Sequence, residues 1–339
     1  MPFLRVLMTL PLKELTIQTL DDLGDRAWTL LNSMTGIRRL SAWSYKLLHM
    51  LQGWAAQLGP TLRHLQLGYC LHVPPITLIS VFSQLPLLRS LRIWGVPSIA
   101  IPSIMACLPN LIVLEMDYQE QGNFPFPSTP LPHLQQLTIV QPTSSSLCDF
   151  GTDELWNWTS SLIPHEGSLQ SFSLVSFEIV IPLSFIACLV HGHGWSLTEF
   201  CVDSAYITPK ALTYPCRNCL ALVLLKCSME SSDVQTITKA IEPAKNLHTL
   251  QFVLWRQVDL PAYDFFSGMM YDDYCSDLNE AGSGYFLLPG TMYGDDWSDL
   301  NEAVPFSAAE VKTLMLRPGS KLRTITFGGI SYFVSRVFG

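Results

Sequence analysis

The feature that most constrains this chain is a short apolar pattern, L-x-x-L-x-L with apolar substitutes, that recurs along almost the whole length. The first six copies are Leu12-Leu15-Ile17, Ile37-Leu40-Ala42, Leu62-Leu65-Leu67, Leu88-Leu91-Ile93, Leu111-Leu114-Met116 and Leu134-Leu137-Ile139. The other five are Leu169-Phe172-Leu174, Leu197-Phe200-Val202, Cys219-Leu222-Leu224, Leu247-Leu250-Phe252 and Leu322-Ile325-Phe327. A pattern that returns at a short interval is typical of proteins that stack one structural unit many times.

The spacing of the copies supports a true repeat. Successive first anchors are 25, 25, 26, 23, 23, 35, 28, 22, 28 and 75 residues apart. The first five intervals lie within the roughly 20–29 residues of a leucine-rich repeat. The residue eight positions after each first anchor is no part of the pattern, yet it is apolar in nine of eleven copies, failing only at Gln119 and Pro142. The sequence therefore predicts a leucine-rich-repeat array.

The spacing also predicts the architecture. The residues around the second anchor of each copy are expected to form a short β-strand, whose alternate side chains point to opposite faces. Such a strand cannot bury its apolar side alone, so it stacks in parallel on the next copy while a return segment covers it. The predicted fold is therefore α/β: a right-handed horseshoe solenoid, with parallel strands on the concave face and helices and loops on the convex face. Leu65, Leu91, Leu114 and Leu137 are expected to share one continuous core.

The return segments are expected to be helices where they are long enough. The predicted helices cover residues 21–34, 46–58, 152–162, 231–241 and 307–316. Acidic residues such as Asp153 and Glu154 favour a helix N-terminus, and Ser307 and Glu310 have the spacing of a capping box. Where prolines accumulate between Pro97 and Pro132, loops or single helical turns are predicted instead.

Charge is distributed unevenly along the chain. Ten of the 28 acidic residues lie between Asp259 and Glu302, and no Lys or Arg occurs between Arg256 and Lys312. We therefore predict a repeat array over residues 1–258, an acidic insertion loop over 259–305, and a C-terminal helix with the last repeat strand over 306–339. The insertion contains an internal repeat, 271–281 against 293–303, identical at eight of eleven positions. It is either a duplicated docking motif or a tandem duplication in a tolerant loop.

Composition argues against several classes of protein. A net charge of −8 argues against nucleic-acid binding, which requires an excess of Lys and Arg over the phosphates. The longest apolar stretch, 179–190, contains Pro182 and is too short to span a bilayer. The start of the chain lacks the basic region and cleavage site of a signal peptide. The nine cysteines are odd in number and follow no framework spacing, which favours reduced core thiols. We therefore expect a cytoplasmic or nuclear protein that binds no membrane.

Four segments carry a family resemblance. They are the L-x-x-L-x-L-x-x-C copy ending at Cys70, the P-x-L-x-x-L segments that begin at Pro86 and Pro109, and residues 314–323. With them the chain resembles the leucine-rich-repeat region of fungal F-box-type proteins. In that family an N-terminal F-box docks a ubiquitin-ligase scaffold and the repeats select a substrate. The resemblance thus implies a protein-interaction module for substrate recognition.

The resemblance leaves two alternatives open. No segment matches an F-box, because repeat sequence begins by residue 12. A ligase scaffold is therefore an expected partner only if an F-box lies upstream. Otherwise the chain is expected to be a repeat-only scaffold or a degenerate family member without a ligase role.

Candidate chemistry is confined to one region, 191–227. Cys216, Cys219 and Cys227, with His191 and His193 upstream, are the one metal-like group, but a structural zinc site needs a second ligand pair at fixed spacing. The segment 191–194 is predicted to be a turn. The chain lacks the motifs of a nucleophile elbow, a phosphate-binding loop and a dinucleotide site. We therefore expect no catalytic residue, metal or cofactor, and a metal-dependent enzyme is the less favoured alternative.

The outward residues beside each second anchor predict where a partner would bind. Trp and Arg dominate the energetics of protein interfaces and are not needed there for solubility. The predicted partner-binding residues on the concave face are Arg39, Trp43, His64, Arg92, Trp94, Glu115 and Asp117. The alternative is that each Trp merely packs on a neighbour. In the ninth copy Ala221, Val223 and Leu225 are assigned outward and are all apolar, which predicts a buried strand there.

Overall fold

A computed structural model describes residues 6, 9–19, 23–44, 47–118, 131–141, 152–164, 167, 169–176, 179–230, 234–255, 307–327 and 330–333. The predicted acidic insertion and its internal repeat lie outside these residues, as do Cys148 and Cys275. In the described part of the chain short strands alternate with helices, so the fold is α/β.

Twelve strands form one open sheet, and their order in the sheet is their order in the sequence. The strands are β1 (Glu14–Thr19), β2 (Arg39–Ser44), β3 (His64–Gly68), β4 (Ser90–Ile93), β5 (Val113–Asp117), β6 (Gln136–Val140), β7 (Ser171–Val175), β8 (Glu199–Tyr206), β9 (Leu224–Glu230), β10 (Thr249–Trp255), β11 (Thr324–Phe327) and β12 (Ile330–Phe333). Neighbours from β1 to β11 pair in parallel. This arrangement is consistent with a solenoid.

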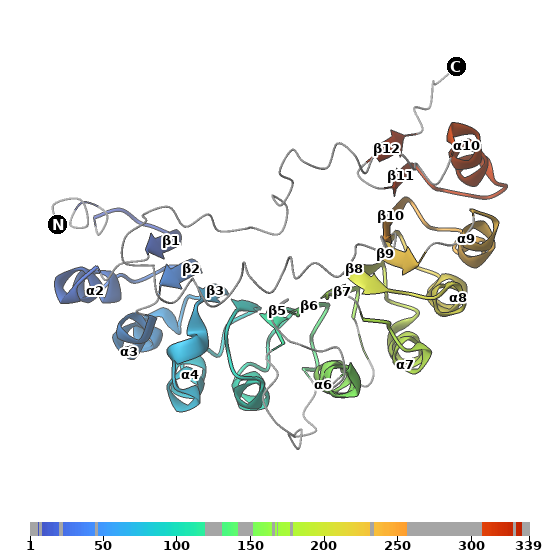
Figure 1. Cartoon of the computed structure of the whole chain (residues 1–339). Helices are drawn as coiled ribbons and strands as arrows, with labels where there is room; N and C mark the ends of the chain where they lie inside the picture. Colours follow the sequence, from blue (N-terminus) through green and yellow to red (C-terminus); the bar gives the residue numbers. More distant parts are fainter. Residues whose placement is uncertain are drawn as a thin grey trace, which may run out of the picture.

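The helices connect the strands and all lie on one side of the sheet. They are α2 (Asp25–Asn32), α3 (Leu47–Leu58), α4 (Pro75–Phe82), α5 (Ile101–Ala106), α6 (Thr152–Leu162), α7 (Leu183–His193), α8 (Pro209–Asn218), α9 (Val234–Ile241) and α10 (Ala308–Leu316), with 3-10 turns η1 (Cys70–His72) and η2 (Ser98–Ala100). Figure 1 shows the sheet curved into an arc, with the strands along its inner side and the described helices along its outer side. We call the inner side of the sheet, on which none of the described helices lies, the open face.

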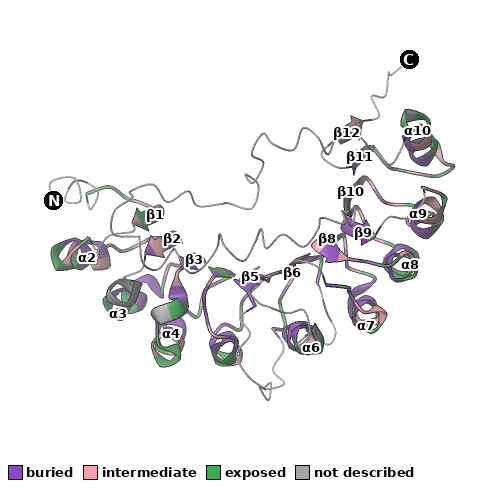
Figure 2. Cartoon of the chain, in the orientation of Figure 1, coloured by how far each residue is buried: buried purple, intermediate pink, exposed green. Residues whose placement is uncertain are grey.

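One hydrophobic core runs the length of the array between sheet and helices, where Figure 2 shows the buried residues. The pairing register aligns Leu65 with Leu91, Leu91 with Leu114 and Leu114 with Leu137. Each of these four leucines is at most 3% exposed. The prediction of one continuous leucine core is confirmed, because a strand of this length buries its inward side chains only against its neighbours.

The core continues across the long gap before the last repeat. β10 pairs directly with β11, so that Thr249 lies opposite Thr324. The rings of Phe252 and Phe327 stack with their centroids 5.4 Å apart. The expectation that the last repeat strand stacks on the copy at Leu247 is therefore confirmed. Beyond it, β12 pairs with β11 in the antiparallel direction and ends the sheet, which the repeat pattern did not predict.

The register predicted for the ninth copy is wrong by three residues. Leu225 pairs with Phe200 on one side and Leu250 on the other, so Leu225 is the second anchor and Leu222 the first. Leu225 is fully buried rather than facing outward. The outward residues of β9 are instead Leu224 and Lys226, and the anchors follow one another at intervals of 25 residues, as expected of a regular repeat. The wrong alignment arose because Cys219 and Leu222 are both apolar and three positions apart, so either could be taken as the first anchor.

The helix predictions hold for the segments with clear signals. α6 covers the predicted range, and α10 begins at a capping box in which the Ser307 hydroxyl accepts the N–H of Glu310 while the Glu310 carboxylate accepts that of Ser307. α4, α7 and α8 were not predicted. α8 contains Pro215 near its C-terminal end, a residue that ordinarily argues against a helix interior.

The turn predicted at 191–194 is wrong. His191 and His193 belong to the last turn of α7, and His193 is 1% exposed. Its Nε2 lies 2.9 Å from the Pro164 carbonyl oxygen, and its Nδ1 lies 3.4 Å from that of Gly167. His193 therefore holds the segment after α6 against the end of α7.

Candidate functional site

The predicted partner-binding residues lie together on four neighbouring strands. Arg39 and Trp43 are on β2, His64 on β3, Arg92 on β4 with Trp94 directly after it, and Glu115 and Asp117 on β5. Arg39 and Arg92 are exposed, and Trp43, His64, Trp94 and Glu115 are half-buried. Residues as far apart in the sequence as Arg39 and Glu115 therefore form one continuous surface, because the parallel register brings equivalent positions side by side.

Two tryptophans from strands on either side of β3 meet across it, and we call Trp43 and Trp94 the indole pair. Their ring centroids are 5.0 Å apart and their planes are tilted by 33°. The ring of Tyr69 is edge-on to that of Trp43, with the two ring centroids 6.0 Å apart. The indole N–H of Trp43 donates to the Ser41 hydroxyl at 3.2 Å. A tilted aromatic contact of this kind contributes about 0.5–1.5 kcal/mol beyond burial. The pair is therefore a partly rigid aromatic surface, in which each ring packs on the other and stays half-buried.

A glycine makes the indole pair geometrically feasible. Gly68 is the residue of β3 that pairs with Trp43. A Cβ atom at Gly68 would lie 2.2 Å from Cε3 of Trp43, a distance that no side chain tolerates. Since strands in a sheet are about 4.8 Å apart, β2 and β4 are separated by nearly 10 Å, and the Trp43 ring must cross β3 to reach Trp94. Gly68 leaves that path open.

The two arginines are each paired along the sheet. Arg39 Nε lies 3.3 Å from Oε1 of Glu14 on β1, and Arg92 Nε lies 3.0 Å from Oε2 of Glu115 on β5. Burial raises the pKa of Glu115, and the Arg92 guanidinium opposes that shift. The Arg39 pair is largely exposed, so it contributes little to stability. Both guanidinium groups remain accessible enough to contact a partner.

Asp117 is wrongly predicted as an exposed, partner-binding residue. Its side chain is buried, and its two carboxylate oxygens accept the Gly95 N–H at 2.9 and 3.0 Å. Gly95 has a φ of 75°, in the left-handed region that glycine adopts at little cost. Asp117 thus stabilises the turn after β4, which carries Trp94, and we place it beneath the surface rather than on it.

His64 lies between the indole pair and the edge of the sheet at which the strands begin. Burial lowers the pKa of His64 below its usual value of 6.5; the cation of Arg39 and that of Arg89 lower it further, against the opposing effect of Glu14. The imidazole is therefore mostly neutral at pH 7. It can donate one hydrogen bond and accept one from a partner.

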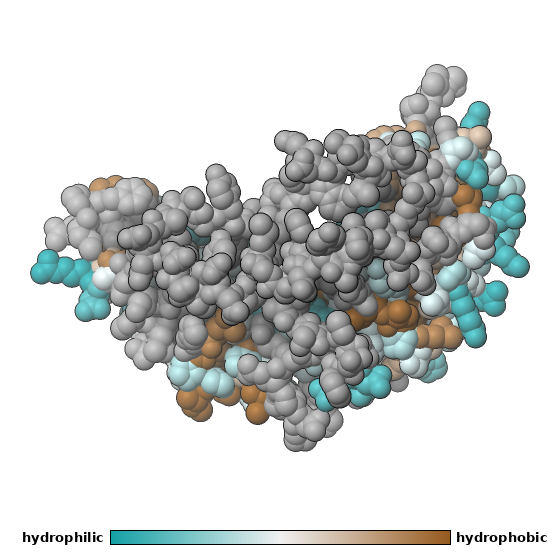
Figure 3. Space-filling model, in the orientation of Figure 1, coloured by the Kyte–Doolittle hydropathy of each residue, from teal (hydrophilic) through white to brown (hydrophobic). Residues whose placement is uncertain are grey.

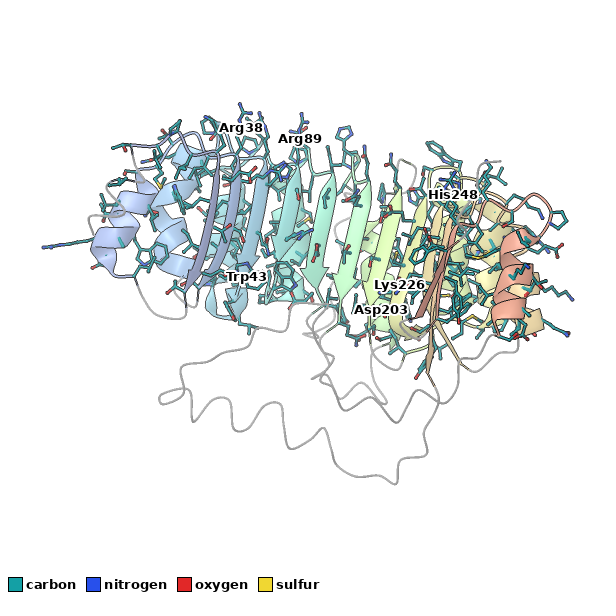
Figure 4. The ribbon with its side chains drawn as sticks, turned by 90° about the horizontal axis from the view of Figure 1, so that it is seen from above. Arg38, Trp43, Arg89, Asp203, Lys226 and His248 are labelled. Atoms are coloured by element: carbon teal, nitrogen blue, oxygen red, sulfur yellow. The ribbon has the colours of Figure 1, made fainter. Side chains whose placement is uncertain are left out.

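A second polar pair on the open face lies outside the predicted set of partner-binding residues. Lys226 on β9 binds Asp203 on β8, with Nζ 2.6 Å from Oδ2. Figure 4 shows both residues toward the same edge of the sheet as Trp43, opposite the edge that holds Arg38 and Arg89. Asp203 pairs in register with Val175 of β7. Lys226 was missed because the register of the ninth copy was wrong, and the interval of 25 residues was the signal that would have found it.

The cysteine and histidine group does not assemble into a site. Cys216, Cys219 and Cys227 are buried, and burial raises the pKa of Cys216 and of Cys219 to about 12 and that of Cys227 well above its usual value. Within the described ranges no three His, Cys, Asp or Glu side chains are grouped as metal ligands. Both ring nitrogens of His193 face backbone carbonyls.

Comparison with known proteins identifies no family. No protein-family model and no curated protein matches the chain. Among solved structures the chain is similar to one from the crystal structure of the Rad7 and Elc1 complex in yeast, with 14% identity over 76% of this chain and 80% of that one, and a TM-score of 0.36. That TM-score is too low for the likeness to indicate a shared function. Of the described helices, none is long and apolar enough to cross a membrane.

Proposed function

We propose that this chain is a leucine-rich-repeat solenoid that binds a protein partner on its open face, with the indole pair at the centre of the contact. The observation that carries the proposal is the geometry of Trp43 and Trp94, which meet at 5.0 Å on that face and stay half-buried. Aromatic residues at the centre of an interface, with arginines beside them, are the usual composition of an interaction hot spot. Arg39 and Arg92 are those arginines.

The open face is also prepared for binding before a partner arrives. The Trp43 ring is held by Trp94, by Tyr69 and by the Ser41 hydroxyl, so ordering it costs little side-chain entropy on association. The strands beneath it are fixed by parallel pairing on both sides. A rigid aromatic surface on a regular sheet favours a macromolecular partner over a small ligand, which would need a deep concave pocket.

The resemblance to F-box-type proteins would make the partner a substrate of a ubiquitin ligase. Support for this finer role comes from the repeat pattern alone, and an F-box upstream would be needed to dock the scaffold. A repeat-only scaffold uses the same surface without a ligase. Co-purification of the full-length product with a ligase scaffold separates the two roles.

The metal-dependent enzyme is the weaker alternative. It would require a group of metal ligands with free imidazole nitrogens at His193, whereas the described residues hold no such group and the imidazole is directed at two carbonyls. Metal analysis of the purified protein tests it. Stoichiometric zinc released only on unfolding would favour the enzyme over the interaction module.

Site-specific photo-crosslinking tests the proposed surface. A photoreactive amino acid at Gln66, on β3 beside the indole pair, is expected to capture a protein partner in cells. The control is the same amino acid at Ile76, which is 73% exposed on α4 in the same repeat but on the outer side of the arc. Figure 3 shows hydrophobic atoms gathered in the region of α4, so this control also accounts for nonspecific apolar capture.

The expected result is a partner captured from Gln66, absent from Ile76, and lost when Trp43→Ala and Trp94→Ala are combined in the Gln66 protein. Equal capture from both positions, or capture that survives the double substitution, would contradict the assignment of the open face.

A further inference from the structure

The residue directly before each of the first four strands is a cation. We call Lys13, Arg38, Arg63 and Arg89 the basic ladder. The backbone connects its members: the Arg38 N–H donates to the Lys13 carbonyl at 2.7 Å, that of Arg63 to Arg38 at 2.9 Å, and that of Arg89 to Arg63 at 2.8 Å. Because neighbouring strands are about 4.8 Å apart, the four cations stand in single file over about 14 Å.

The ladder covers four consecutive copies at one end of the array. The equivalent positions of the next five copies hold Ile112, Gln135, Gln170, Thr198 and Val223, and those before β10 and β11 hold His248 and Arg323. Lys13, Arg38 and Arg89 are exposed, and Arg63 is half-buried with its guanidinium Nη1 3.1 Å from the Leu87 carbonyl oxygen. Figure 4 places Arg38 and Arg89 at the edge where the strands begin, opposite the edge that holds Trp43. The ladder therefore borders the same repeats as the indole pair without overlapping it.

Among the described side chains, none forms an ion pair that neutralises the charge of the ladder. The three ion pairs among the described side chains involve Arg39, Arg92 and Lys226, and none includes a ladder cation. Of the carboxylates on β1 to β5, Glu14 and Glu115 are already bound to Arg39 and Arg92, and Asp117 is buried. A chain with a net charge of −8 thus has a strongly positive edge.

We propose that the basic ladder binds an extended acidic peptide segment, a run of Asp and Glu residues, in the protein partner recognised by the open face. The inference rests on the function proposed above and adds the chemistry of the partner. A span of about 14 Å matches four to five extended residues at about 3.3 Å each. Arginine forms two parallel hydrogen bonds with a carboxylate, which makes a row of arginines suited to such a run.

A short acidic peptide suits the charge of the chain better than a nucleic acid does. A long polyanion would extend past the ladder, which ends before Ile112, and would meet a protein with eight more acids than bases. Nucleic-acid binding draws its affinity from many phosphate contacts, which four cations in one row do not supply. A peptide of the length of the ladder contacts the cations alone.

Fluorescence anisotropy with a labelled hexapeptide of alternating Asp and Glu, against one of Asn and Gln, tests the proposal on the full-length chain. The acidic peptide is expected to bind and to weaken as salt rises. The triple substitution Lys13→Glu, Arg38→Glu and Arg89→Glu is expected to weaken it about tenfold or more, while leaving thermal unfolding unchanged because these side chains are exposed. Arg63 is retained for its contact with Leu87.

A matched triple substitution separates the ladder from overall charge. Arg217→Glu, Lys239→Glu and Lys312→Glu alter the same net charge at exposed positions of α8, α9 and α10 and are expected to alter the affinity less than about twofold. Equal losses from both triples would overturn the proposal, as would tighter binding of a single-stranded oligonucleotide of equal charge. A carbodiimide crosslink from Lys13 to a carboxylate between residues 259 and 302, formed without peptide, would show that an acidic segment of this chain occupies the ladder. That result would also overturn the proposal.

The partner captured from Gln66 distinguishes failure of this inference from failure of the proposed function. If the ladder triple leaves partner affinity unchanged while loss of the indole pair abolishes it, the ladder inference is wrong and the function stands. If the hexapeptide binds the ladder but no open-face partner depends on the indole pair, the proposed function is wrong and the ladder stands.

Discussion

Leu114→Ala is expected to lower the free energy of unfolding by about 2–5 kcal/mol, the usual cost of removing a fully buried leucine. Leu114 is 0% exposed and lies between Leu91 and Leu137 in neighbouring strands. The truncation leaves a cavity in the middle of the array, where each repeat is stabilised only by the repeats beside it. Chemical denaturation followed by circular dichroism measures the loss.

The matched control for that prediction is Leu220→Ala. Leu220 is 74% exposed in the turn before β9, so the same truncation there removes little buried surface. We expect it to alter the free energy of unfolding by no more than about 0.5 kcal/mol. Similar losses from both substitutions would mean that Leu114 does not lie in a shared core.

Gly68→Ala is expected to separate the indole pair and to weaken partner binding about 30-fold or more, the loss associated with removal of a hot spot worth about 2 kcal/mol. A methyl group at position 68 would meet Trp43 at 2.2 Å from Cε3 and 2.8 Å from Cδ2, so the indole must leave its place on Trp94. The ring can rotate toward solvent, and stability is therefore expected to change less than binding.

Circular dichroism detects the separation without a partner. Two indoles at 5.0 Å couple their electronic transitions, and the resulting signal is expected to disappear in Gly68→Ala and in Trp94→Phe alike. The control is Gly167→Ala, where an added methyl meets only Pro164 at an ordinary 3.8 Å. An unchanged signal in Gly68→Ala would show that the tryptophans do not depend on the glycine.

The parallel strands of the repeats could be predicted from sequence because they depend on a local pattern of anchors, whereas α4, α7 and α8 were not predicted. Leucines that repeat at nearly constant intervals determine which side chains face inward, whatever the remaining contacts are. The prediction failed at the ninth copy, where Cys219 and Leu222 are both apolar and both buried, so the pattern alone could not choose between them. It also failed at His193, whose place in α7 depends on carbonyls from residues far earlier in the chain.

The candidate site could be predicted only in part. The outward position of Trp43 and Trp94 follows from the repeat. Their contact also depends on the absence of a side chain at Gly68, on the pairing register of the strands and on the rotamers of both rings. The burial of Asp117 depends on the left-handed backbone at Gly95, which turns an N–H toward the carboxylate. The residues of the basic ladder could be found from sequence alone, by comparing one position across the first four copies.

The affinity of the captured partner for the Trp43→Ala, Trp94→Ala double variant tests the central claim most directly. Calorimetry is expected to show each single substitution costing about 2 kcal/mol or more, and the double costing less than their sum because the rings act as a unit. Trp195→Ala is the matched control, since Trp195 is 71% exposed after α7 and is expected to leave affinity unchanged. Unchanged affinity in a folded double variant would show that the open face does not bind the partner through the indole pair.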